Sequence, residues 1–258
     1  MDNKPLKIID LFSGIGGFSY AAEVLVGGFE TVQFVEIDPY CQQVLNTHWP
    51  HVPIHGDIQT YEPARHSADV ICGGFPCQDI SYAGNNAGIA EGTRSGLFYQ
   101  LMRVIRAVRP SYVLLENVSA IRTRGLDIVL GEMAEAGFDV EWSCIRASEL
   151  GASHRRDRWW AVAYTKHQGL QGCRTERQLS ESGSQIKTGW RCSHQLQSNW
   201  REYVSEPVLR RGNDGLSHRV DRLKALGNAV VPQVAAIPFK RIQDIHVSQT
   251  ALSRSAAG

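Results

Sequence analysis

Four side chains in this sequence have types that could together support a reaction with a cysteine nucleophile: Cys77, Glu116, Arg156 and Arg158. A cysteine thiolate is a strong nucleophile, a carboxyl group can exchange protons, and a guanidinium can hold oxygen atoms in a fixed geometry. Most free cysteines are only small buried side chains. The position of Cys77 favours a chemical role, because Cys77 follows an apolar run predicted to be buried and two glycines, where a strand turns into a loop.

The elements that must position these groups alternate between strands and helices, which predicts an α/β fold with a doubly wound, mostly parallel sheet. Strands are expected at residues 7–12, 31–35, a short one near 54–58, then 68–72, 111–115, 138–145 and 159–164. Helices are expected at 18–26, 39–45, 97–108, 126–136 and after Pro232 to about Ile242. Ligands of such sheets bind beyond the strand ends, and all four candidate side chains lie beside a predicted strand end.

A glycine turn, residues 13–17, joins the first predicted strand to the first helix. Glycines let the backbone approach a ligand closely, so this βα unit is typical of nucleotide-binding folds. The full dinucleotide fingerprint is absent. Glu36 ends the second strand about 20 residues later, where a carboxylate can accept hydrogen bonds from ribose hydroxyls.

Charge and composition indicate the class of protein, the kind of partner and the compartment. The chain has 258 residues, 43% hydrophobic and 21% charged, as in ordinary globular proteins. Residues 1–165 carry a net charge of −6, residues 166–224 carry +5 and residues 225–258 carry +2. A basic late segment favours contact with a polyanion. The N-terminus lacks the apolar core of a signal peptide, and the six cysteines have no paired spacing, so we expect a cytoplasmic protein with reduced thiols.

Three parts of the chain are expected. Residues 1–165 form a catalytic and cofactor-binding domain, residues 166–218 a small irregular second domain, and residues 219–258 a C-terminal segment that returns to the first domain. The second part is rich in Gln, Ser, Gly and Arg. It contains a set of possible zinc ligands in non-standard spacing, so no metal is predicted: His167, Cys173, Cys192 and His194.

Seven stretches together resemble the DNA (cytosine-5)-methyltransferase family. They occur in the family's order along nearly the whole chain: residues 10–18, 36–38, 56–58, 76–78, 116–118, 156–158 and 227–232. The resemblance implies a Rossmann-like fold that uses S-adenosylmethionine. It also implies that residues 166–218 are a reduced target-recognition region, since family members usually carry a larger one.

The resemblance implies a methyl-donor site at the glycine turn. Phe18 and Ile37 would pack on the adenine, Glu36 would accept from the ribose, and Asp57 and Ile58 would frame the adenine edge. The full set of implied cofactor-binding residues is Phe12, Ser13, Gly14, Gly16, Gly17, Phe18, Glu36, Ile37, Asp57, Ile58, Pro76, Leu97, Asn228, Ala229 and Val230.

The same resemblance assigns the chemistry. Cys77 would add to carbon 6 of a flipped-out cytosine, and Glu116, with a raised pKa, would hydrogen-bond ring nitrogen 3. Arg158 would hold the base carbonyl, and Arg156 would support the thiol or a phosphate. Gln78, Ser81 and Arg94, from the stretch before and inside the long loop 81–96, would contact DNA.

The implied partner is double-stranded DNA, bound by a monomer that could belong with a cognate restriction enzyme. Three alternatives remain at this stage: a methyltransferase-like protein that binds nucleic acid without turnover, cytosine-5 methylation of RNA, and a nicotinamide-dependent dehydrogenase. The dehydrogenase would explain the glycine turn but would leave Cys77 and Glu116 without a role.

Overall fold

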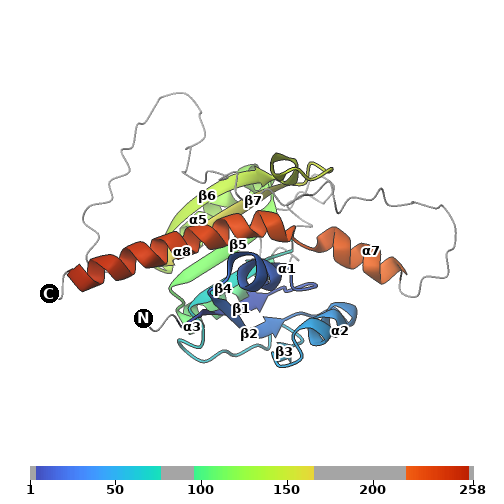
Figure 1. The fold of residues 1–258 in the computed structure, drawn as a ribbon, viewed down its shortest axis with the longest axis horizontal. Coiled ribbons are helices and arrows are strands. Elements are labelled where there is room, and N and C mark those ends of the chain that lie inside the picture. The colour runs from blue at the N-terminus through green and yellow to red at the C-terminus, as the bar shows by residue number, and fades with distance from the viewer. Residues whose placement is uncertain (1–3, 77–95, 166–218, 256–258) are drawn as a thin grey trace.

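The structure, a computed structural model of the chain, describes residues 4–76, 96–165 and 219–255. A seven-stranded sheet runs through it in the order β3-β2-β1-β4-β5-β7-β6 (Figure 1). The strands are β1 (Leu6–Leu11), β2 (Phe29–Val35), β3 (Ile54–His55), β4 (Val70–Gly74), β5 (Tyr112–Val118), β6 (Phe138–Arg146) and β7 (Asp157–Thr165). The pairs among β1 to β5 are parallel, whereas β7 is antiparallel to both of its neighbours. The predicted mostly parallel sheet is confirmed.

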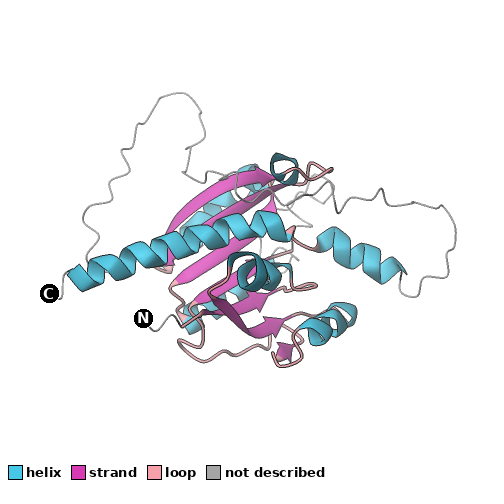
Figure 2. Ribbon diagram, in the orientation of Figure 1, coloured by secondary structure: helices cyan, strands magenta, loops and turns pink. Residues whose placement is uncertain are grey.

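Helices cover both faces of this sheet, as a doubly wound fold requires (Figure 2). They are α1 (Gly17–Tyr20), the π-helix η1 (Ala21–Val26), α2 (Pro39–His48), α3 (Leu97–Val108), α4 (Ile121–Arg124), α5 (Leu126–Glu135), the 3₁₀ helix η3 (Ala147–Leu150), α7 (Arg219–Asn228) and α8 (Pro232–Ser255). Helices α3 and α5 pack on one face of the sheet, and α1, η1 and α8 pack on the other.

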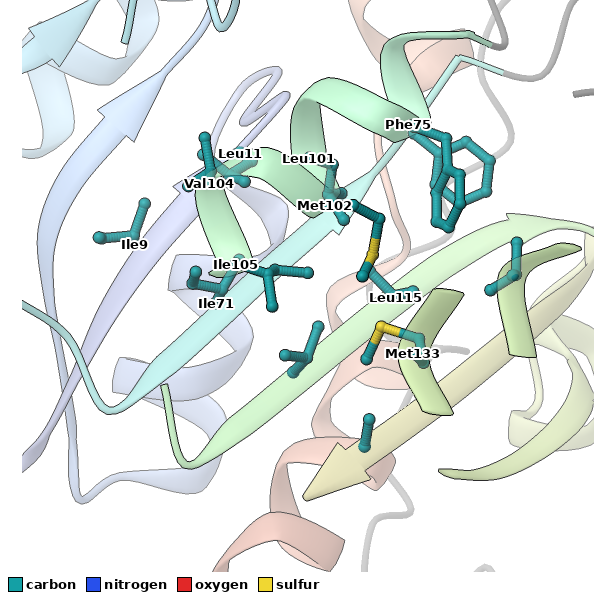
Figure 3. Packing of buried hydrophobic residues seen from close by; sticks show 14 of the residues in the cluster. Ile9, Leu11, Ile71, Phe75, Leu101, Met102, Val104, Ile105, Leu115 and Met133 are labelled. Carbon is teal, nitrogen blue, oxygen red and sulfur yellow. The ribbon is translucent and has the colours of Figure 1, made fainter. Parts of the chain in front are cut away.

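The core under α3 explains why the strands are continuous apolar runs. Both faces of β4 and β5 are covered, so residues that point to either side are buried. Figure 3 shows this packing for Ile71, Leu101, Met102, Leu115 and Met133. This packing fixes the positions of the strand ends, and therefore the positions of the residues that follow each strand.

Two predicted helices differ from the structure. The segment predicted as one helix, 18–26, is a single α-turn followed by the six-residue π-helix η1. The last helix extends to Ser255, well past the predicted end at Ile242. Its polar extension is fixed by a tertiary contact, because the Tyr112 hydroxyl donates to Gln249 Oε1 at 2.7 Å and lies 3.2 Å from His246 Nδ1.

The proposed target-recognition region, residues 166–218, lies outside the described residues, as do the four possible zinc ligands within it. The described ranges contain no cluster of three potential metal-binding side chains. Within those ranges, no helix combines the length and the apolar character needed to cross a membrane.

A bidentate ion pair fastens α8 to the sheet. Arg241 donates from Nε and Nη2 to the two carboxylate oxygens of Glu141 on β6, at 2.9 and 2.8 Å. Replacing Arg241 with methionine is expected to lower the free energy of unfolding by about 1–2 kcal/mol, because a partly buried bidentate pair exceeds an ordinary surface pair. Urea denaturation measures the loss. Lys240→Met, at the exposed neighbouring position, should change little, and equal losses in both variants would contradict the prediction.

Candidate active site

A cleft of about 330 Å³ lies at the carboxyl ends of the parallel strands. Its lining comes from the first, middle and last parts of the chain. The predicted site residues among it are Phe12, Ser13, Gly14, Phe18, Glu36, Ile37, Pro76, Glu116, Arg156, Arg158, Asn228, Ala229 and Val230. The glycine turn and the candidate chemical groups therefore share one space, as the strand-end argument expects.

The glycine turn is held by backbone hydrogen bonds. Gly16 N donates to Ser13 O at 2.9 Å, and the Ser13 hydroxyl donates to Asp10 O at 2.6 Å. Gly14 and Gly16 have φ of +54° and +83°, a conformation that disfavours other residues. A Cβ atom on Gly14 would meet nothing within 4 Å, so this part of the turn opens onto free space.

Glu36 links the turn to the second strand end. Its Oε2 accepts from Gly14 N at 2.7 Å and its Oε1 from Asp38 N at 2.8 Å. The residue is 8% exposed. Each carboxylate oxygen has a second lone pair, so the fixed carboxylate can still accept from a ligand's hydroxyl groups.

The two apolar residues predicted to pack on the ligand differ in exposure. Ile37 is 71% exposed beside the cleft, which is unusual for an aliphatic side chain. Phe18 is 2% exposed and packs edge-on against Trp160 and Phe239, with ring centroids 5.9 and 6.4 Å away. Phe18 is therefore mainly a core residue whose edge reaches the cleft, and Ile37 offers the larger free apolar surface.

A buried carboxyl group lies beneath the turn. Asp10 is fully buried, its Oδ2 accepts from the Ser19 hydroxyl at 2.8 Å, and its Oδ1 has no hydrogen-bond partner among the described residues. Burial raises the pKa of Asp10 to about 8, although the hydrogen bond from Ser19 opposes this. The protonated acid is therefore the form that the fold favours at neutral pH.

Asp10→Asn should make the stability of the protein less sensitive to a rise in pH between about 4 and 8. Because the folded-state pKa lies above the unfolded value, the stability linked to the Asp10 proton is complete below about pH 4 and is lost as pH rises through about 8. An amide keeps the neutral form at every pH. Thermal unfolding from pH 6 to 9 should show the variant gaining about 1–3 kcal/mol on the wild type as pH rises. Parallel stability curves would refute the prediction.

Glu116 and Arg158 form an ion pair inside the cleft, with 3.0 Å between Oε1 and Nε. Burial raises the pKa of Glu116, while the charges of Arg158 and Arg156 partly oppose the increase. The direction agrees with the prediction. Gly74 on the adjacent strand leaves room for this carboxylate, since a Cβ there would lie 2.9 Å from Oε2.

Arg156, which we predicted to support the thiol or a phosphate, lines the cleft and binds two carbonyl groups of the C-terminal segment. Its guanidinium donates to Gly227 O at 3.0 Å and to Ala229 O at 2.5 Å. The residue adopts φ of +26°, an uncommon conformation for a side chain of this size. The structure thus assigns Arg156 to holding the C-terminal segment against the cleft.

The C-terminal segment closes the same side of the site. A Cβ on Gly17 would lie 2.6 Å from Val230 Cγ2, so the missing side chain allows this close approach. Lys224 on α7 pairs with Asp38 at 2.6 Å across the cleft wall. The sequence motifs assigned no role to Lys224 or Asp38.

The backbone that leads to Cys77 is anchored at the cleft. Asn117, which is 1% exposed, donates from Nδ2 to Phe75 O at 3.2 Å and accepts from Val118 N at 2.8 Å. Pro76 lines the cleft. Cys77 itself lies outside the described residues, together with three predicted DNA contacts, Gln78, Ser81 and Arg94.

Some predicted cofactor residues do not line the cleft: Gly16, Gly17, Asp57, Ile58 and Leu97. Ile58 is 5% exposed and belongs to the core under α3, against which Leu97 also packs. The Asp57 carboxylate accepts from Gln59 N at 2.9 Å. Ile58 and Leu97 thus belong to the packing behind the cleft, and a role of these five residues in cofactor binding stays a prediction.

The sequence matches one family model over residues 6–213, that of C-5 cytosine-specific DNA methylases. The chain belongs to this family. It is 35% identical over 163 residues to the type II methyltransferase M.CviJI of Paramecium bursaria Chlorella virus IL3A, covering 62% of this chain and 43% of that protein. It is 34% identical over 166 residues to the type II methyltransferase M.NlaX of Neisseria lactamica, covering 62% and 53%. The chain spans about half the length of the curated relatives it matches.

Solved structures agree on the fold. The Dnmt2 methyltransferase of S. pombe superposes with a TM-score of 0.53 at 21% identity, covering 70% of this chain and 57% of that one. The methyltransferase EhMeth of Entamoeba histolytica gives 0.51 at 15% identity, covering 64% and 54%. At these identities the likeness concerns the arrangement of the sheet and helices.

Proposed function

We propose that this protein transfers a methyl group from S-adenosylmethionine to carbon 5 of cytosine in double-stranded DNA. The observation that carries the proposal is the cleft in which the Glu116–Arg158 pair faces the glycine turn tied to Glu36. Pro76, the neighbour of Cys77, lines the same cleft. Membership of the C-5 cytosine-specific DNA methylase family supports the reaction class.

The residues at the turn fit an adenosyl group. Glu36 has free lone pairs for a ribose diol, Ile37 offers an exposed apolar surface for a base, and Gly14 leaves the backbone open. Asn228 and Ala229 would complete the pocket from the C-terminal side, in a segment that Arg156 holds through the carbonyls of Gly227 and Ala229. When bound, S-adenosylmethionine supplies a methyl group activated by its sulfonium charge.

The residues of the chain would act on the cytosine. The Cys77 thiolate would add to carbon 6, which makes carbon 5 nucleophilic toward the methyl group. Once carbon 5 carries the methyl group, a base would take its proton, the bond between sulfur and carbon 6 would break, and the thiolate would leave. Protonated Glu116 donates to nitrogen 3 and offsets the charge that the thiolate brings. Arg158, paired with Glu116, would hold the neighbouring carbonyl oxygen.

Two observations favour DNA as the substrate. The curated relatives named above are type II methyltransferases, and residues 166–224 carry a net charge of +5, which suits a phosphate backbone. A cytosine inside a duplex is inaccessible to a buried cleft, so the base must flip out. We further propose that the protein acts as a monomer and is linked to a restriction enzyme of the same specificity.

The deciding experiment supplies labelled S-adenosylmethionine with cytosine-containing duplex DNA or with RNA, followed by digestion to nucleosides. Label in 5-methylcytosine from DNA alone is the expected result. Label in RNA alone would show that RNA, and not DNA, is the substrate. Binding of the methyl donor without transfer to either nucleic acid would favour a nucleic-acid-binding protein without turnover.

A further inference from the structure

Glu23 joins three elements that lie next to the glycine turn. It belongs to the π-helix η1, and each of its carboxylate oxygens accepts a hydrogen bond from a neutral donor elsewhere. Oε1 accepts from Thr31 N on β2 at 2.6 Å, and Oε2 accepts from Trp49 Nε1 at 2.7 Å. Among the described residues, no basic side chain forms an ion pair with Glu23. Its carboxylate therefore serves to hold a backbone amide and an indole.

The indole of Trp49 lies directly against Gly16. A Cβ atom built on Gly16 would come within 2.5 Å of Trp49 Cζ3 and 2.8 Å of Cη2, so the ring packs on the bare backbone of the turn. Trp49 is 8% exposed, and its ring meets that of Phe34 edge-on at 5.5 Å. The contact with Phe34 restricts the position of the Trp49 ring, and the hydrogen bond to Glu23 fixes the orientation of the ring.

Gly16 connects the Trp49 indole to the residues of the turn that line the cleft. Its N–H closes the turn onto Ser13 O at 2.9 Å, and its carbonyl accepts from Tyr20 N at 2.9 Å. Ser13 and Gly14 line the cleft, and Gly14 N is bonded to Glu36. A shift of the indole would therefore move the residues that face an adenosyl group.

We propose that Glu23 is a positioning residue for the methyl-donor site, acting through the Trp49 indole that it fixes beneath Gly16. The proposal deepens the proposed function and rests on it. The π-helix supports the assignment, because such turns disrupt regular helical hydrogen bonding and occur often at functional sites. Here η1 carries a carboxylate within an otherwise apolar segment, Ala21–Val26, and turns it toward β2 and Trp49.

Calorimetric titration of the full chain with S-adenosylhomocysteine tests the proposal. Glu23→Ala and Trp49→Phe should each raise the Kd about tenfold, the scale of a lost hydrogen bond to a charged group. The double variant should bind about as weakly as either single variant, because both changes break one pathway. In methylation assays, the KM for the donor should rise while kcat at saturating donor stays close to that of the wild type.

The matched control is Glu141→Gln, which weakens the anchor of α8 away from the cleft and should lower the Tm without changing Kd. Unchanged Kd in both single variants, or additive losses in the double variant, would overturn the role of Glu23. If Glu23→Ala fails to fold, the Kd of Trp49→Phe decides. If the wild type does not bind S-adenosylhomocysteine, the proposed function itself is wrong, and the role proposed for Glu23 is wrong as a consequence.

Discussion

Cys77→Ser is expected to lower methyl transfer to DNA by about a thousandfold or more, because a hydroxyl lacks the nucleophilicity of a thiolate. The binding of S-adenosylhomocysteine should stay near the wild-type Kd, since the glycine turn and Glu36 are untouched. Transfer of labelled methyl groups to duplex DNA measures the first quantity and calorimetry the second. The matched control is Cys144→Ser on β6, a half-buried thiol outside the cleft lining, which should keep activity.

The covalent step gives Cys77 a second signature. Duplex DNA with 5-fluorocytosine at the target has no proton to lose at carbon 5, so the adduct cannot resolve. The wild type should then remain attached to the DNA under denaturing electrophoresis, and Cys77→Ser should not. A wild-type preparation that methylates ordinary DNA but does not become trapped would exclude the covalent mechanism.

The second large effect concerns Glu116. Glu116→Gln is expected to lower kcat by about 10²–10⁴-fold, because an amide cannot deliver a proton toward nitrogen 3 as the thiolate adds. The amide has nearly the same volume, so it should fit beside Gly74 and leave donor binding intact. Glu132→Gln, which breaks an exposed pair with Arg106 on the α3–α5 side, is the matched control and should keep kcat.

The pH dependence of the wild type should identify the same group. Burial raises the pKa of Glu116, and only the protonated acid donates a proton, so kcat should fall as pH rises through this raised pKa. The descending limb should disappear in Glu116→Gln. A glutamine variant with wild-type kcat, or one that keeps the same descending limb, would assign proton transfer to another group.

The strand-end rule predicts much of the site from the order of residues alone. Apolar runs locate β1, β2, β4 and β5 within a few residues, and the groups after them, Ser13, Glu36, Pro76 and Glu116, line one cleft. This works because parallel strands buried on both faces are nearly continuous apolar runs, whose ends are sharp in sequence.

The local geometry is less accessible from sequence. The apolar pattern of residues 18–26 is compatible with an α-helix or a π-helix, so the π-helix η1 is known only from the structure. The sequence also contains no sign that the guanidinium of Arg156 binds Gly227 and Ala229, which belong to a segment about 70 residues away. Asn117 was assigned no role, although it anchors the carbonyl of Phe75.

Periodicity and motif spacing are local properties of the chain, so they are enough to predict the strands, the glycine turn and the types of chemical groups. The contact between Arg158 and Glu116 depends on the tertiary structure. Arg158 lies at the start of its strand, which would be the wrong edge in an all-parallel sheet. It reaches the cleft because β7 runs antiparallel to β5 and pairs Arg158 with Val118. Strand direction depends on long-range pairing, which the residues along one strand do not encode.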